Sequence, residues 1–340
     1  MNSGWSRRKI ITIAVVVIIT AAFYFTYPPA YRPVSFPNGK KFAFAIVDDT
    51  DGATMEKIKP VYDYLQELGV LCTKTVWVLP TNDPERWPNR GVTLADSEYV
   101  DYLLHLQSEG FEIAFHGARG GNSTRQDVIG ALETFRDVFG DYPRIHINHS
   151  QNYDNLYWGA DKLSLAPLSF LYDIFYTGSP SYGHIPESEY FWGDIAQDRI
   201  SYVVNFSFEE INTLKVNPLI PYHLDAQPYV NYWFHSSDGG FVDSFNELIK
   251  KENVDRLESE MGVCFVYTHF ASSFFKNGSI NPVFRERMAY LASRDGWFAP
   301  AGEVLDYIRE HRERGDEPNF RERVYIELRW LYEKLLHGSR

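Results

Sequence analysis

Apolar residues along the chain form short runs that alternate with amphipathic segments. Phe42–Val47 is an unbroken apolar run and predicts a strand buried on both faces. From Ile58 to Leu68 apolar residues recur every three or four positions, which predicts a helix that starts at Pro60 and stops at Gly69. The same patterns predict strands at 71–79, 111–115, 145–148, 200–206, 263–269 and 297–299, and helices over 96–109, after Ser123, from about 243, from 282, over 303–311 and along the stripe Phe320, Val324, Leu328, Leu331 and Leu335. Strands alternating with helices predict a parallel α/β sheet or barrel with right-handed crossovers.

Polar residues stand where several of these strands end, and they comprise Asp48, Asp49, Asp51, His116, His146, His149 and His269. In parallel α/β folds, ligands bind at the carboxyl ends of the strands. Neighbouring carboxylates repel one another unless a cation or a shared proton relieves them. Oxygen and nitrogen donors without a thiolate suit a catalytic Zn²⁺ or a similar divalent ion. The alternative is that one aspartate caps the next helix and the others are solvated.

The N-terminus carries an uncharged run of 18 residues, Ile10–Tyr27, directly after Arg7, Arg8 and Lys9. This length and charge pattern predict an uncleaved transmembrane anchor with its N-terminus in the cytoplasm and the rest of the chain outside. A cleaved secretion signal is the alternative, and either one takes the domain out of the cytosol. The proline-rich residues 28–40 are expected to form a short, stiff tether.

Composition limits the classes of function. The 340 residues are 44% apolar, which is enough for a sizeable core in one large domain or two smaller ones. A net charge of -12 and a pI near 5.3 argue against a nucleic-acid partner, because phosphate binding needs a clustered basic surface. Cys72 and Cys264 lie in apolar runs and are expected to be buried thiols rather than a disulfide framework or a zinc site.

Several segments resemble the polysaccharide deacetylase family (NodB homology, carbohydrate esterase family 4) over roughly residues 40–310. Val47–Asp49 is similar to the family's first motif, and Val266–His269 is similar to its last motif. Phe111–His116 resembles the strand that enters the second motif, and Trp297–Leu305 resembles the C-terminal strand and helix. The resemblance implies a distorted (β/α) barrel, often of seven strands, and metal-dependent removal of acetyl groups from an amino-sugar polymer.

The resemblance also implies roles for four residues. The first aspartate of the motif, Asp48, would be the general base, and the second, Asp49, would bind the metal together with His116. His269 would be the general acid that protonates the leaving amine. The metal would polarise the acetamide carbonyl and lower the pKa of a water.

The second motif departs from the family pattern. The family places a second metal-binding histidine four residues after the first, but Gly120 stands there in this chain. His149, at the end of the next strand, is expected to replace it as a ligand, and His146 is the alternate. The family's arginine-containing third motif is not legible, and Asn148–Asn152 occupies about its place.

These inferences divide the chain into a cytoplasmic tail (1–9), an anchor (10–27), a linker (28–40), a barrel (41–312) with a long insert at about 151–240, and a C-terminal helix (313–340). We expect a membrane-anchored hydrolase that acts on a polysaccharide or cell-wall glycan outside the cytoplasm.

Two other functions stay open. A barrel that has lost the chemistry would bind a glycan without cleaving it. A glycosidase would need a second carboxylate, for which Asp238 or Glu209 is available. The aromatic residues of the insert either stack on sugar rings or pack the insert itself, and they include Trp158, Trp192, Tyr232 and Trp233.

Overall fold

The computed structural model describes residues 28–31, 33–86, 89–176 and 180–337. The predicted cytoplasmic tail and transmembrane anchor lie outside these residues. Within the described ranges, no helix has both the length and the apolar character needed to cross a membrane.

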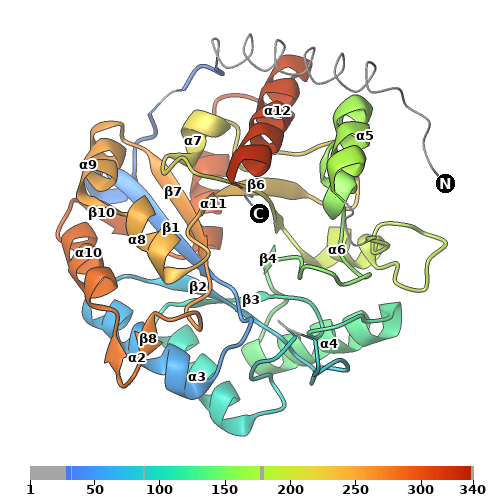
Figure 1. Cartoon of the computed structure of the whole chain (residues 1–340), viewed down its shortest axis with the longest axis horizontal. Coiled ribbons are helices and arrows are strands. Elements are labelled where there is room, and N and C mark those ends of the chain that lie inside the picture. The colour runs from blue at the N-terminus through green and yellow to red at the C-terminus, as the bar shows by residue number, and fades with distance from the viewer. Residues whose placement is uncertain (1–27, 32, 87–88, 177–179, 338–340) are drawn as a thin grey trace.

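Seven parallel strands form a closed barrel (Figure 1). They are β1 (Phe42–Asp48), β2 (Cys72–Val76), β3 (Glu112–Phe115), β4 (Ile145–His146), β5 (Tyr202–Phe208), β6 (Tyr232–Asp238) and β7 (Val263–Thr268). Neighbours in the chain pair with one another, and β7 pairs with β1 to close the ring. A further strand, β10 (Gly296–Phe298), pairs with the start of β1, and β8 (Phe275–Lys276) pairs with β9 (Ser279–Ile280) in a separate hairpin. The expected (β/α) barrel of about seven parallel strands is confirmed.

Helices surround the barrel (Figure 1). They are α2 (Met55–Glu67), α3 (Ser97–Ser108), α4 (Arg125–Phe139), α5 (Ala166–Phe175), α6 (Gly193–Arg199), α7 (Thr213–Val216), α8 (Val242–Leu248), α9 (Lys251–Ser259), α10 (Pro282–Ala292), α11 (Ala301–Glu310) and α12 (Phe320–His337), with 3₁₀ turns η1 (Pro37–Gly39) and η2 (Gly159–Lys162).

Strand β1 is buried on both faces, as its apolar run predicts. Its small inward residues join a cluster with side chains from β3 to β7, and they are Ala43, Ala45 and Val47. Its larger residues pack outward beneath the helices, and they are Phe42, Phe44 and Ile46. Small side chains face inward because the lumen of a narrow barrel has little room. This two-residue alternation continues past the strand and decides where the following aspartates point.

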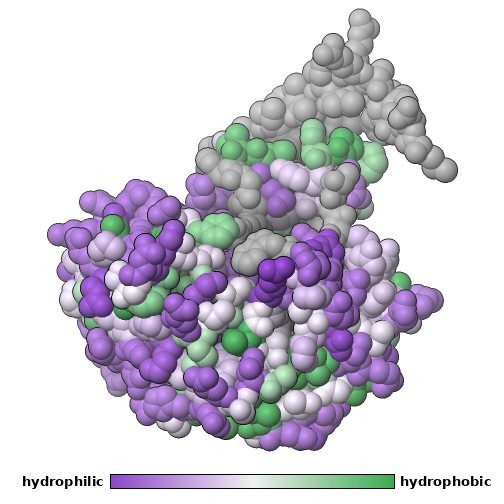
Figure 2. Space-filling view, turned by 60° about the horizontal axis from the view of Figure 1, so that its bottom comes forward, coloured by the Kyte–Doolittle hydropathy of each residue, from purple (hydrophilic) through white to green (hydrophobic). Residues whose placement is uncertain are grey.

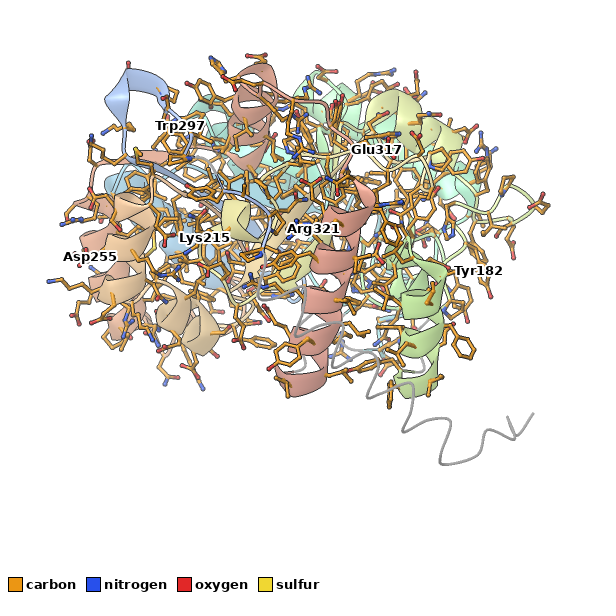
Figure 3. All side chains as sticks on the ribbon, turned by 90° about the horizontal axis from the view of Figure 1, so that it is seen from above. Tyr182, Lys215, Asp255, Trp297, Glu317 and Arg321 are labelled. Atoms are coloured by element: carbon orange, nitrogen blue, oxygen red, sulfur yellow. The ribbon has the colours of Figure 1, made fainter. Side chains whose placement is uncertain are left out.

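Helix α12 packs beside α5 and against β5 (Figure 3). Val324, Leu328 and Leu331 are buried there as the apolar stripe predicts, whereas Phe320 and Leu335 at the two ends of the stripe are exposed. Other exposed apolar side chains lie on both helices, and they are Phe170, Ile174, Phe175, Tyr332 and Leu336. In the space-filling view, hydrophobic residues gather in the upper part of the coloured surface, and others lie singly or in small groups across the lower part of a mostly hydrophilic face (Figure 2).

Three local predictions are wrong. Helix α2 begins before Pro60, which lies inside it. Thr124 rather than Ser123 caps α4, because its side chain accepts from the Asp127 N–H while the Asp127 carboxylate accepts from the Thr124 N–H. The aromatic run that ends at Phe234, for which no strand was predicted, supplies the first three residues of strand β6, where pairing with β5 satisfies its backbone.

Candidate active site

Asp48 is the last residue of β1. Following the two-residue alternation of the strand, its side chain points outward from the barrel and lies in the wall beneath α2. Its side chain is fully buried. The Lys74 ammonium and the Tyr62 hydroxyl donate to its Oδ2 at 2.8 and 2.9 Å, and the Phe270 N–H donates to its Oδ1 at 2.7 Å. Asp48 therefore ties β1 to β2, to α2 and to the segment after β7.

Asp49 follows on the inward side and lies at the mouth of the barrel. Its Oδ1 is 3.2 Å from His116 Nε2, and its Oδ2 is 3.6 Å from His269 Nε2 and accepts a hydrogen bond from the Tyr267 hydroxyl. Burial alone would raise the pKa of Asp49. The two imidazoles and the Tyr267 hydroxyl outweigh burial and hold this pKa below its usual range.

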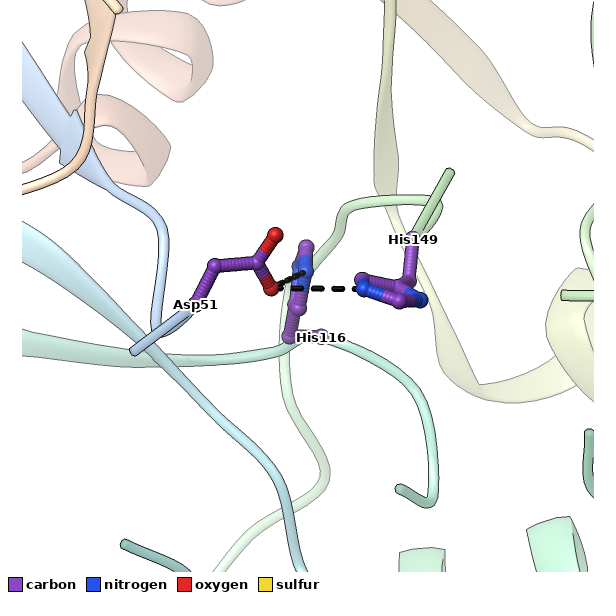
Figure 4. Close-up of side chains that lie close together, drawn as sticks. All are labelled: Asp51, His116 and His149. Carbon is purple, nitrogen blue, oxygen red and sulfur yellow. Dashed lines mark ion pairs between the residues drawn. The ribbon is translucent and has the colours of Figure 1, made fainter. Parts of the chain in front are cut away.

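Asp51 lies where three loops meet. Its Oδ1 is 3.4 Å from Nε2 of His116 and 3.4 Å from Nε2 of His149 (Figure 4). The two histidines extend from the ends of β3 and β4, and all three side chains are nine-tenths buried or more. Burial and the neighbouring Asp49 raise the pKa of Asp51, while burial lowers the pKa of both imidazoles.

The atoms of this trio that face one another lack hydrogen bonds within the described part of the chain. Asp51 Oδ1, His149 Nε2 and both ring nitrogens of His116 are buried without a hydrogen bond, and His116 Nε2 lies 3.2 Å from Asp49 Oδ1. His149 Nδ1 lies 3.0 Å from Asn152 Oδ1, so it carries the proton and leaves a lone pair on Nε2, which faces Asp51. Buried polar atoms without partners are costly, and one divalent cation would satisfy three of these at once.

His269 lies on the other side of Asp49 from His116. Its Nδ1 is 2.8 Å from the Gly240 carbonyl and therefore donates to it, which leaves Nε2 directed toward Asp49. The Phe241 ring stacks on the imidazole, with ring centroids 5.8 Å apart. Asp49, Asp51 and His269 form a second group whose ligand atoms lie close enough to share a cation.

His146, the alternate ligand, lies apart from both groups. Its Nδ1 is 3.2 Å from the Phe115 carbonyl and its Nε2 is 3.2 Å from Asn148 Oδ1, so the neutral ring donates to one of these two acceptors and both ring nitrogens face protein oxygens. Burial lowers the pKa of His146 to about 3. Its ring packs edge-on against Trp192 in the outer core.

Gly120 occupies the place of the family's second histidine for a steric reason. The backbone of Asn89 packs against it so closely that a Cβ at position 120 would lie 2.7 Å from the Asn89 carbonyl oxygen. No side chain fits there unless this backbone moves. His149 supplies an imidazole to the same region from the next strand.

A cavity of about 370 Å³ opens beside these groups. Asp49, Asp51 and His269 line one part of it, and Trp158, Lys162 and Trp330 line another. Its walls come from the ends of β1, β5 and β7 together with η2, α5 and α12. The cavity is large enough for a sugar ring and its substituents.

Residues 151–240, expected to be an insert, contain the barrel strands β5 and β6, and their aromatic side chains divide between packing and the cavity. Trp158 lines the cavity, whereas Trp192 and Trp233 are buried in the core. Asp238 and Glu209, the carboxylates that a glycosidase would need, are not among the residues lining this cavity.

The structure brings together Asp49, His116, His149 and His269, which the sequence proposes as site residues, and places Asp48 in the wall behind them. Two contributors had no predicted role. Asp51 is the carboxylate that lies 3.4 Å from both histidines, and Tyr267 orients Asp49. The alternation along β1 is the signal that separates Asp48 from Asp49, whereas the position of Asp51 depends on the turn that follows.

No protein-family model matches the chain, and no curated protein matches it. Among solved structures, a putative polysaccharide deacetylase from Mycobacterium smegmatis is 14% identical, with 86% of this chain and 98% of that chain covered and a TM-score of 0.48. A probable polysaccharide deacetylase from Pseudomonas aeruginosa PAO1 is 11% identical, with 84% and 97% covered and a TM-score of 0.49. A GH57-type branching enzyme from Pyrococcus horikoshii is 11% identical, with 82% and 72% covered and a TM-score of 0.46. Similarity this distant does not determine activity.

Proposed function

We propose that this protein is a metal-dependent hydrolase that removes acetyl groups from an amino sugar of a polysaccharide. One observation carries the proposal. Three buried ligand atoms without hydrogen-bond partners, from Asp51, His116 and His149, converge beside the Asp49 carboxylate and the His269 imidazole, and Asp49, Asp51 and His269 line the cavity. Ligands of this kind beside separate acid and base groups are what metal-assisted hydrolysis needs.

The trio fits a divalent cation such as Zn²⁺. Two imidazole nitrogens and one carboxylate oxygen form a donor set found in catalytic zinc sites. Asn152 fixes the tautomer of His149 from behind, as partners of metal-bound histidines do. When bound, the cation would polarise the acetyl carbonyl and make a water more acidic.

Asp49 takes the role of general base in this proposal, in place of Asp48. It faces the cavity, and its lowered pKa keeps it ionised at neutral pH. The Tyr267 hydroxyl and the Asp51 N–H hold the carboxylate in one orientation. Asp49 is therefore able to accept the proton of an attacking water at an oxygen that already faces the site.

His269 is the proposed general acid. The bond from Nδ1 to the Gly240 carbonyl fixes the ring, so only Nε2 faces the cavity and is available to hand a proton to the leaving amine. The stacked Phe241 ring limits rotation of the imidazole. Base and acid thus stand on one side of the trio with 3.6 Å between Asp49 Oδ2 and His269 Nε2.

The proposed substrate is a polysaccharide or cell-wall glycan, and the proposed place of action is outside the cytoplasm. The anchor pattern at 10–27 supports this location. The indole of Trp158 at the cavity supports a sugar, because aromatic faces stack on sugar rings.

Metal content of the full chain tests the proposal first. We expect about one Zn²⁺ or similar ion per chain by elemental analysis. Asp51→Asn, His116→Ala and His149→Ala should each lose the ion, and His146→Gln is the matched control that should keep it. Release of acetate from chitin oligomers and from peptidoglycan, with and without a chelator, then tests the chemistry.

Three outcomes would count against the proposal in different ways. A wild-type chain that binds no divalent ion removes the hydrolase and favours a glycan-binding barrel. If metal binding survives His149→Ala but not His146→Gln, then His146 and not His149 is the metal ligand. If the protein binds the metal but releases acetate from no acetylated sugar, the metal site stands and the deacetylase reaction is refuted.

A further inference from the structure

Lys162 is a buried lysine at the edge of the cavity. It ends the turn η2, its side chain is only 5% exposed, and it lines the same cavity as Asp49 and His269. Lysine side chains are almost never this buried unless a charge of opposite sign pairs with them.

Lys162 has no such partner within the described residues. Its ammonium donates to the Asn205 carbonyl at 3.1 Å and lies 3.8 Å from the centre of the Trp158 ring and 5.8 Å from that of Trp330. No carboxylate from the described ranges comes within 4.0 Å of Lys162 Nζ, although other buried cations such as Lys74 are paired in this way. An ammonium has three donors, and only one of them has an acceptor here.

A second lysine lines this part of the cavity. Lys334 on α12 lies beside Trp330, with its ammonium 5.4 Å from the centre of that ring. Its positive charge and the burial of Lys162 together lower the pKa of Lys162 to about 7, with burial the larger cause. The two carboxylates that the described lining contains, Asp49 and Asp51, belong to the candidate hydrolytic centre.

We propose that Lys162 and Lys334 form a subsite for an anionic substituent, a carboxylate or a phosphate, on the amino sugar that is deacetylated. This inference rests on the proposed function and adds the class of substrate. An anion between the two ammonium groups would accept the free donors of Lys162 and relieve the repulsion between the lysines. The indoles of Trp158 and Trp330 lie against the same ammonium and shield it from water, which strengthens the ion pair.

Both lysines and three residues of the hydrolytic centre, Asp49, Asp51 and His269, line one cavity, so a sugar bound there is exposed to both groups. An anionic sugar supplies the counter-charge that keeps the buried Lys162 protonated, whereas a neutral sugar supplies none. The site therefore discriminates by charge, since a buried polar group left unpaired costs more than a missing contact at the surface.

Calorimetric titration of the full-length protein with three sugars tests this subsite. The probes are N-acetylmuramic acid, which carries a carboxylate, N-acetylglucosamine 6-phosphate, and neutral N-acetylglucosamine. We expect at least one anionic sugar to bind about tenfold more tightly than the neutral one, which is the worth of one charge-assisted hydrogen bond. The anion that binds more tightly identifies the source of the charge.

Variants assign the preference to the lysines. In Lys162→Met, which keeps the length of the side chain, the preference should fall below about threefold. Lys334→Gln should also reduce the preference for the anionic sugar. It provides a second test if Lys162→Met does not fold. Lys41→Met removes an exposed lysine elsewhere and should leave the preference intact.

Equal binding of all three sugars to the wild-type protein would overturn the subsite, as would a preference that survives both lysine variants. The titrations are run with a chelator present, so the proposed metal-dependent hydrolysis does not proceed and the two proposals fail separately. A charge preference without acetate release removes the hydrolase and keeps the subsite. Acetate release with no charge preference removes the subsite and keeps the hydrolase.

Discussion

The buried ion pair between Asp48 and Lys74 gives the sharpest quantitative prediction. Both side chains are fully buried, and the ammonium lies 2.8 Å from the carboxylate. At an effective dielectric constant of 20, charges at that distance attract by ~6 kcal/mol. Lys74→Met removes this attraction and leaves the carboxylate buried with the Tyr62 hydroxyl and the Phe270 N–H as its remaining donors. Removing one partner of a buried ion pair costs about 3–5 kcal/mol, and we expect Lys74→Met to lower the free energy of unfolding by an amount in that range.

The assay is urea unfolding of full-length variants. Lys59→Met is the matched control, because Lys59 pairs with Asp63 at 2.7 Å but both side chains are about half exposed. Lys59→Met should lower the free energy of unfolding by only about 0–1 kcal/mol. The double variant Asp48→Asn/Lys74→Met removes both charges and should recover part of the loss. A cost below about 1 kcal/mol for Lys74→Met would refute the pairing described here.

The same pair decides the role of Asp48. If Asp48 anchors the wall, Asp48→Asn lowers stability, and acetate release per folded molecule falls less than about tenfold. Asp49→Asn should instead lower turnover by about 10²–10⁴ with little change in stability, since that is what a general base contributes. The opposite result, with Asp48 essential and Asp49 dispensable, would restore the role that the sequence resemblance implies.

Three further predictions concern the metal ligands, the buried lysine and the missing histidine. Asp51→Asn should lose the metal ion while Asp49→Asn keeps it, measured by elemental analysis, and the reverse pattern would exchange their roles. Because the folded-state pKa of Lys162 is lowered from 10.5 to about 7, the unfolded chain binds more protons between these values, so the free energy of unfolding should rise with pH over that range. Lys162→Met should flatten this rise, which is at most about 5 kcal/mol, and an unchanged slope in urea titrations would contradict the shift. Gly120→Ala should lower stability by about 1–3 kcal/mol, because its Cβ would meet the Asn89 backbone; an unchanged unfolding midpoint would show that the loop adapts.

The sequence predicts the barrel well where its elements are long and regular. The apolar run at Phe42–Val47, the strand that ends before His269 and the helices between them all appear in the structure. Strand β6 was missed because an aromatic run without polar alternation, set among long irregular connections, has no period to read. Element boundaries shifted by a few residues, as at Pro60, where tertiary packing of the first turn outweighs the preference for proline at a helix start.

The sequence predicts the kind of site, a cluster of metal-ligating residues, but not which carboxylate takes part in it. Histidines at strand ends indicated a metal, and His116 and His149 do lie against one carboxylate. The identity of the carboxylate that faces both histidines depends on the backbone dihedral angles of the turn after β1. The sequence pattern does not predict these angles. Lys162 gave no signal at all, because its burial depends on Trp158 beside it and Trp330 in the last helix of the chain.

The place of α12 in the order of the chain has a consequence for biosynthesis. Every residue of the proposed hydrolytic centre, from Asp49 to His269, is translated before Phe320, whereas Trp330 and Lys334 are translated after it. The ribosome thus delivers the proposed reactive groups before the wall that carries the proposed subsite. A chain that stops before Phe320 would carry all the proposed ligands beside an open-sided cavity, so truncation would separate the proposed chemistry from the proposed selectivity.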